Sequence, residues 1–60
     1  MNARLLDTEE IAKYLHLSPR TISSWVWRRK IPYLKLGRSV RFDLGQIQEW
    51  LKAKMVGGNG

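Results

Sequence analysis

The feature that most constrains the fold of this chain is the helix-start signal at Ser18-Pro19. Ser18 is a favoured N-cap residue, and Pro19 suits the first helical position, where its missing N–H costs nothing. A helix is therefore expected over residues 19–28. The segment His16-Leu17-Ser18 before it is long enough only for a tight turn, so this helix must cross the preceding one steeply instead of lying beside it.

The preceding helix is predicted from a capping pattern near the start of the chain. Asp7 can cap a helix, and Glu10, three residues later, can reach back to the backbone N–H of Asp7. Leu6 and Ile11 flank the cap at the positions of a hydrophobic staple. The pattern predicts a helix over residues 8–15.

A third helix is predicted from the same chemistry further along the chain. Asp43 followed by Gln46 repeats the capping pattern, and apolar residues then recur at helical spacing, which gives a helix over residues 44–54. Residues 55–60 are glycine-rich and have no periodicity. We expect one domain over residues 1–54 and a flexible tail over residues 55–60.

Between the second and third helices the sequence predicts a short β-hairpin. Ile31-Pro32 ends the second helix because proline disfavours helical geometry in the residue before it. Gly37-Arg38-Ser39 is the expected turn between two alternating segments. The alternation is expected to place four apolar residues on one side of the hairpin, namely Leu34, Leu36, Val40 and Phe42. Two strands alone are marginal, so the hairpin must pack on the helices.

Charge is segregated along the chain. The formal net charge is +6, from eleven lysines and arginines against five acids, and no acid lies between Ile11 and Phe42. The basic residues of the second helix and hairpin are Arg20, Arg28, Arg29, Lys30, Lys35, Arg38 and Arg41. A face that only needs solubility usually mixes signs, so an anionic partner is favoured over a basic surface with no specific partner.

The angular positions of residues on the second helix divide it into two faces. Ile22, Trp25 and Val26 fall together and are expected to face the core. The opposite arc holds Arg20, Thr21, Ser23, Ser24, Trp27 and Arg28. Short hydroxyls allow close approach to base edges, and arginine reaches phosphate or guanine. The first turn, at Arg20-Thr21, should also offer free N–H groups to a phosphate.

Trp27 stands out because it is a large apolar ring on the polar arc. It either folds over the hairpin or the Ile31-Pro32 corner to complete the core, or it contacts a sugar, a thymine methyl or a partner protein.

Catalysis and cofactors are not expected. Four of the five acids are explained as helix caps or first-turn charges, which leaves Glu49 without a second carboxylate for acid–base chemistry. His16 is the one histidine and there is no cysteine, so the chain has no disulfide and no thiolate ligands for a metal. The lack of cysteine, of a signal peptide and of any long apolar run makes the cytoplasm the expected compartment.

The order and spacing of these pieces resemble the small helix-turn-helix proteins of the excisionase type, which are related to the MerR-type winged helix. The resemblance spans residues 5–51 and rests on Leu5-Leu6-Asp7-Thr8-Glu9-Glu10-Ile11-Ala12-Lys13-Tyr14-Leu15, Leu17-Ser18-Pro19-Arg20-Thr21-Ile22, Trp25, Ile31-Pro32, Lys35-Leu36-Gly37-Arg38-Ser39-Val40-Arg41-Phe42-Asp43 and Glu49-Trp50-Leu51. It implies a mainly α fold with three helices and a two-stranded β-hairpin, the wing. Many relatives have an acidic residue or glycine after the second helix, where this chain has Arg28-Arg29-Lys30.

The resemblance also implies a function. In such proteins the second helix enters the major groove and the wing touches the neighbouring minor groove or backbone. Family members are recombination directionality factors that bind and bend attachment-site DNA of a phage or mobile element, so that the integrase favours excision; others are transcription regulators. The candidate DNA-binding residues are Arg20, Thr21, Ser23, Ser24, Trp27, Arg28, Arg29, Lys30, Lys35, Arg38, Ser39 and Arg41.

Three functions stay open from the sequence: an excisionase-like architectural factor, a small transcription regulator, and a protein-interaction module that recruits an integrase through Trp27 and the tail. MerR-type regulators dimerise through a long helix after the winged domain. We expect this chain to be a monomer in solution, with cooperativity arising between neighbours on DNA.

Overall fold

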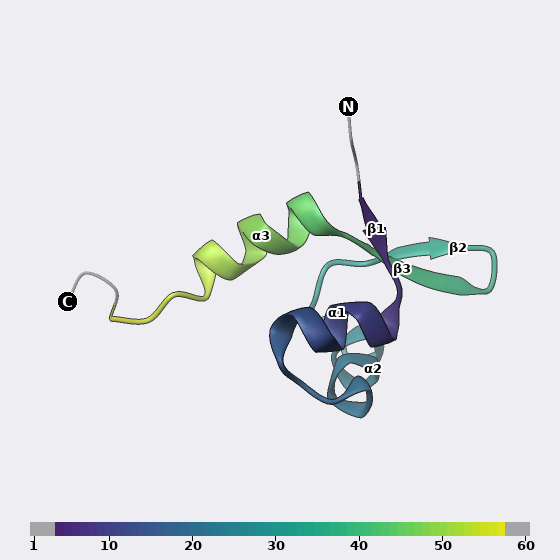
Figure 1. Ribbon diagram of the computed structural model, residues 1–60, viewed down its shortest axis with the longest axis horizontal. Coiled ribbons are helices and arrows are strands. Elements are labelled where there is room, and N and C mark those ends of the chain that lie inside the picture. The colour runs from purple at the N-terminus through teal and green to yellow at the C-terminus, as the bar shows by residue number, and fades with distance from the viewer. Residues whose placement is uncertain (1–3, 58–60) are drawn as a thin grey trace.

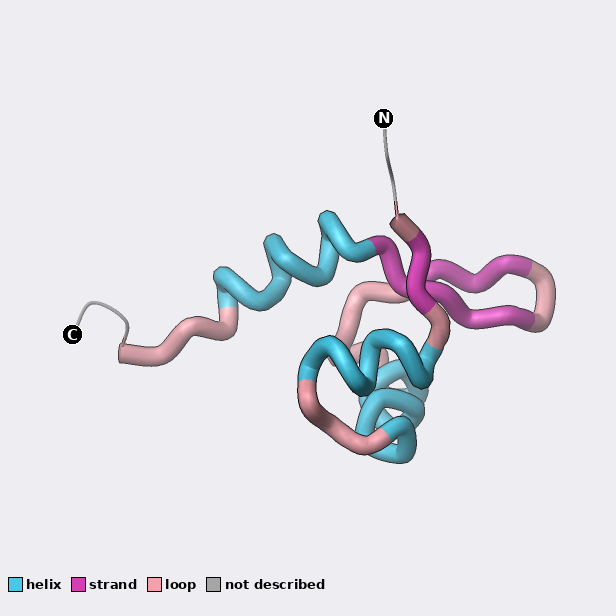
Figure 2. Tube along the Cα trace, in the orientation of Figure 1, coloured by secondary structure: helices cyan, strands magenta, loops and turns pink. Residues whose placement is uncertain are grey.

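The computed structural model describes residues 4–57, and Figures 1 and 2 show the arrangement of its helices and strands. The elements in chain order are β1 (Leu5–Leu6), α1 (Thr8–Leu15), α2 (Pro19–Trp27), β2 (Leu34–Leu36), β3 (Ser39–Asp43) and α3 (Leu44–Ala53). All three helices begin at the predicted residues, and α2 and α3 each end one residue earlier than predicted. No helix among residues 4–57 has the length and hydrophobicity to cross a bilayer.

The start of α1 follows the predicted capping chemistry. The Glu10 N–H donates to Asp7 Oδ1 over 2.8 Å, and the Asp7 N–H donates to Glu10 Oε1 over 2.9 Å. Both residues of the expected staple, Leu6 and Ile11, are buried. The reciprocal bonds satisfy two amides that a helix start would otherwise leave open.

The end of α1 is closed by a left-handed residue. His16 has φ of 59°, and the Leu17 N–H reaches back to the Ala12 carbonyl over 2.8 Å. This is the bonding of a Schellman turn, in a position that glycine usually occupies. The lone histidine of the chain is therefore part of the turn that joins α1 to α2.

The sheet has three antiparallel strands in the order β1-β3-β2, one more than the expected two-stranded wing. The added strand, β1, pairs Leu5 with Asp43 and Leu6 with Phe42. Its two residues are too few to show an alternating pattern, which is why the sequence did not reveal it. The central position of β3 ties the beginning of the chain to the hairpin (Figure 1).

The hairpin register corrects the predicted side-chain faces. Leu36 pairs with Ser39, so the turn is Gly37-Arg38 and is one residue shorter than expected. Gly37 has φ of 63° and Arg38 does not share that region, which is the pattern of a two-residue type II′ turn. A slip of one residue exchanges the two faces of a strand. Leu34 and Leu36 therefore share the face of Arg41, and the prediction that they lie beside Val40 and Phe42 is wrong.

The core lies between the three helices and the sheet. Its buried residues are Leu6, Ile11, Ala12, Ile22, Ile31, Phe42 and Ile47. Trp25 and Val26 pack against it, as predicted for the inner face of α2. Tyr33 and Val40 are the hairpin residues that join it around Phe42, in place of Leu34 and Leu36.

The junction between β3 and α3 has no linker. Asp43 ends β3 and also caps α3, where its Oδ1 accepts from the Gly45 N–H over 3.2 Å. The N–H of Leu44 donates to the Arg4 carbonyl over 2.9 Å, so the beginning of the chain holds the first residue of α3. The helix then runs away from the sheet towards Met55 and Val56, which are exposed and lie outside any element (Figure 1). Residues 58–60 of the expected tail lie outside the described residues.

Candidate nucleic-acid interface

The outward face of α2 presents the side chains that the angular analysis predicted. Arg20 and Ser23 are exposed, and Thr21 and Ser24 are half-buried at the edges of the helix. On the opposite side Ile22 is fully buried. The helix is thus fixed by one face and leaves the other open, with two small hydroxyl residues that allow a close approach to a partner.

The first turn of α2 differs from the prediction of free amides. The Thr21 N–H donates to Ser18 Oγ over 3.2 Å, and the two hydroxyls lie 3.0 Å apart. Pro19 has no N–H, and the N–H of Thr21 is bound by the cap. Among the first three residues of α2, only Arg20 therefore has a backbone N–H that the cap leaves open. A phosphate at this helix end would be held chiefly by the Arg20 side chain.

Trp27 is 88% exposed, which excludes the interpretation that it completes the core. It is the last residue of α2, on the same side as Arg20 and Ser23. An indole left this open on a helix with a well-buried opposite face is available to a partner molecule.

The basic run after α2 is divided by the turn that ends the helix. Arg29 has φ of 58°, its N–H donates to Val26, and the Lys30 N–H donates to the Trp25 carbonyl over 2.7 Å. This second Schellman-type turn sends the side chains apart. Arg29 lies with Trp27 beside the hairpin, whereas Lys30 lies beside Trp25. Arg28 is exposed at the helix end.

The basic residues of the hairpin lie on different faces. Lys35 pairs with Val40 and shares its face, and Arg38 is exposed in the turn next to the exposed Ser39. Arg41 shares the opposite face, where its Nη1 donates to the Val40 carbonyl over 2.8 Å. The structure therefore separates Arg41 from Lys35, which the sequence had grouped together.

A hollow of about 310 Å³ lies between the end of α2 and the hairpin. Its lining consists of Val26, Trp27, Arg29, Tyr33, Lys35 and Val40. The cationic side chains stand beside an apolar floor, which suits a sugar flanked by phosphates. Tyr33 was not among the predicted site residues. Tyr33 lies two residues before Lys35, and residues two apart in an extended segment share a face, so the hairpin register would have placed Tyr33 beside this hollow.

The charge around this surface has one sign. The nearest acids in sequence, Glu10 and Asp43, are both engaged in capping a helix. Among residues 4–57 the single ion pair joins Lys52 to Glu49 over 3.2 Å, away from α2 and the hairpin. The same residues contain no group of acids and histidine arranged to hold a metal ion.

Two helices joined by a tight turn, with an open basic face on the second and a hairpin beside it, define the helix-turn-helix class of DNA-binding domains. The family model described as a helix-turn-helix domain matches residues 5–55, and the chain belongs to this family. The family is a DNA-binding family and not an enzyme family, which supports DNA as the partner. Comparison with curated proteins and with solved structures finds no match.

Proposed function

We propose that this chain is a sequence-specific duplex DNA-binding protein of the excisionase type, which binds and bends attachment-site DNA so that an integrase favours excision. The observation that carries the proposal is the acid-free surface formed by the open face of α2 and the Lys35 side of the hairpin. Its support also includes the family, which contains excisionase-like proteins, and the order of two helices, a hairpin and a third helix, which is the order expected from the resemblance. Residues 1–54 would form the binding domain.

In the proposed complex, α2 lies in the major groove and the hairpin meets the adjoining backbone. Arg20, Ser23, Ser24 and Arg28 would face base edges or the nearest phosphates, with Thr21 supporting the first turn. Arg29 and Lys35 would hold the backbone segment between the two elements, with Trp27 against its sugar or a thymine methyl. Arg38 and Ser39 at the wing tip would extend the contact.

Salt dependence tests the DNA interaction directly. About five neutralised phosphates predict a slope near −4 to −5 in log K against log salt concentration. Fluorescence anisotropy with labelled duplex over a series of salt concentrations measures this slope. A slope near zero, or no duplex binding at about 50 mM salt, would exclude the DNA-binding proposal.

Arginine variants test which residues read sequence. If Arg20 or Arg28 contacts a base, its replacement by alanine costs about 1–3 kcal/mol and relaxes one position of the site. Replacement of Arg38 on the wing by alanine should weaken binding to all DNA sequences alike and reduce the salt slope by about one. If Arg20→Ala and Arg28→Ala each lost as much affinity for random duplex as for cognate duplex, both arginines would be assigned to contacts with the DNA backbone.

A transcription regulator would use the same surface, so the architectural role needs its own test. A fragment labelled at both ends should show increased energy transfer when an excisionase bends it. A footprint over the attachment region of the host element, next to an integrase gene, would support the excisionase role. Binding confined to a promoter, without bending, would favour the regulator.

A further inference from the structure

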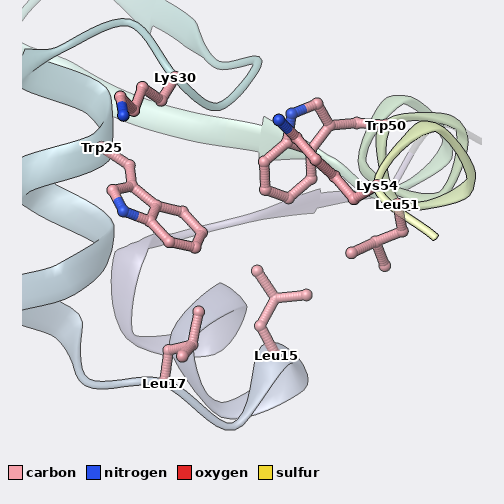
Figure 3. Close-up of a pocket in the computed structure, with 7 residues that line it drawn as sticks. All are labelled: Leu15, Leu17, Trp25, Lys30, Trp50, Leu51 and Lys54. Carbon is pink, nitrogen blue, oxygen red and sulfur yellow. The ribbon is translucent and has the colours of Figure 1, made fainter. Parts of the chain in front are cut away.

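A second concave surface lies on the other side of α2, between the three helices. This apolar groove has a volume of about 400 Å³ and is lined by Leu15, Leu17, Trp25, Lys30, Trp50, Leu51 and Lys54. Figure 3 shows these side chains arranged around an open centre, with Trp25 on the α2 side, Trp50 on the α3 side, and Leu15 and Leu17 below them. The volume lies within the range of about 300–1,000 Å³ that is typical of ligand sites.

The groove exists because α3 leaves the sheet without closing onto the other helices. Ile47, in the first half of α3, is buried, but Trp50 and Leu51, one turn later, are only half-buried. Trp25 and Trp50 meet edge to face with ring centroids 5.9 Å apart, so their contact fixes the position of both walls. Leu17, which also lines the groove, is 37% exposed. A rigid apolar surface of this kind is typical of a protein-interaction site.

The charges around the groove are both positive. Lys54 Nζ lies 5.6 Å from the centroid of the Trp50 ring, and Lys30 stands at the rim on the α2 side. No acidic residue lines the groove. An occupant must therefore combine apolar side chains for the indoles with carboxylates for the two ammonium groups.

The elements around the groove also limit the backbone of an occupant. All lining residues belong to helices or to the turns that follow them, and none lies on a strand. An extended peptide docks by adding to a sheet edge, which this groove does not offer. A helix satisfies its own backbone hydrogen bonds and can lie in an apolar groove.

We propose that this groove docks an acidic amphipathic helix of a partner protein, with apolar side chains against Trp25, Trp50 and Leu17 and carboxylates at Lys30 and Lys54. The site lies on the face of α2 opposite to Arg20 and Ser23. A partner bound here leaves the proposed DNA surface open, and the protein can hold both at once.

Tryptophan fluorescence tests the proposal in the absence of DNA. In a Trp27→Phe protein the two groove tryptophans are the only indoles, so the signal reports on the groove alone. The probe is a synthetic helix with leucine on one face and glutamate on the other. We expect a saturable blue shift, because the leucines displace water from the indoles. The absence of a saturable change would overturn the proposal.

Charge variants separate a specific site from general attraction. Lys54→Glu should weaken binding of the glutamate helix about tenfold, because a like charge replaces the complementary one. Lys52→Glu makes the same change in net charge two residues away, at a lysine engaged with Glu49, and should have little effect. A probe helix with lysine in place of glutamate should bind the Lys54→Glu protein more tightly than it binds the parent protein. Equal loss in the Lys52 and Lys54 variants would overturn the proposal.

Other occupants would also give distinct results. Sedimentation of the protein alone would reveal a dimer if a second copy filled the groove. NMR signals of the Trp25 and Trp50 indole N–H groups would move on addition of duplex if DNA entered it. Either result overturns the acidic-helix proposal, and neither depends on whether α2 binds DNA as proposed.

Discussion

Arg29 occupies a backbone conformation that costs free energy for any residue except glycine. Its φ of 58° places it in the left-handed region, at the turn that ends α2. A non-glycine residue in this region costs roughly 1 kcal/mol, so Arg29 lowers the free energy of unfolding relative to glycine at the same position. We expect Arg29→Gly to raise the free energy of unfolding by about 1 kcal/mol in urea titrations and to weaken duplex binding.

The neighbouring arginine provides the matched control for this prediction. Arg28, the C-cap residue that follows α2, has φ of −89°, an ordinary conformation, so Arg28→Gly removes the same charge without relieving strain. This variant should be no more stable than the parent protein. If both glycine variants gained stability equally, the gain would come from reduced charge repulsion and not from the backbone.

Trp27 contributes little to the folded state because it is 88% exposed. Trp27→Ala should therefore change the free energy of unfolding by no more than about 0.5 kcal/mol. If the indole contacts the DNA backbone or a thymine methyl, the same change should weaken duplex binding by more than about 1 kcal/mol. Thermal melts and anisotropy titrations of one preparation measure both quantities. Unaltered binding would remove Trp27 from the proposed interface.

At the scale of elements, the register of the hairpin makes two similar cations unequal. Lys35 faces the hollow beside α2, whereas Arg41 lies on the opposite face and donates to the Val40 carbonyl. Lys35→Ala should reduce the salt slope by about one, and Arg41→Ala should leave it nearly unchanged. A larger effect from Arg41 would mean that the outer face of the wing meets the DNA.

The capping box of α1 is a second device at this scale. Asp7→Ala removes the acceptor of the Glu10 N–H and should cost about 1 kcal/mol of stability. Glu9→Ala removes an acid from the same turn without touching the cap, and should cost less. Urea denaturation of the two variants distinguishes capping from a general effect of charge near the helix start.

At the scale of the molecule, the features that the sequence predicted well are those governed by neighbours in the chain. Helix starts are set within four residues, so Asp7, Ser18 and Asp43 predicted all three. The inner and outer faces of α2 follow from helical periodicity alone. The confirmed part of the fold thus needed no knowledge of tertiary contacts.

The features that escaped prediction depend on pairing between distant segments. The faces of Leu34 and Leu36 depend on whether the turn has two or three residues, and the alternating pattern allows both. Strand β1 exists only through its partner β3. The separation of Arg29 from Lys30 depends on a left-handed residue that the sequence signals only when it is glycine. The binding roles of these residues stay predictions.

The direct junction between β3 and α3 makes chain length a determinant of the fold. One residue inserted between Asp43 and Leu44 would turn every later position of α3 by about 100° and carry Ile47 out of the core. The same insertion in the Gly57-Gly58 segment would displace nothing that lies before it. The number of residues that separates Phe42 from Ile47 is thus as strict a requirement as the identity of either, and deletions there should be as damaging as polar substitutions in the core.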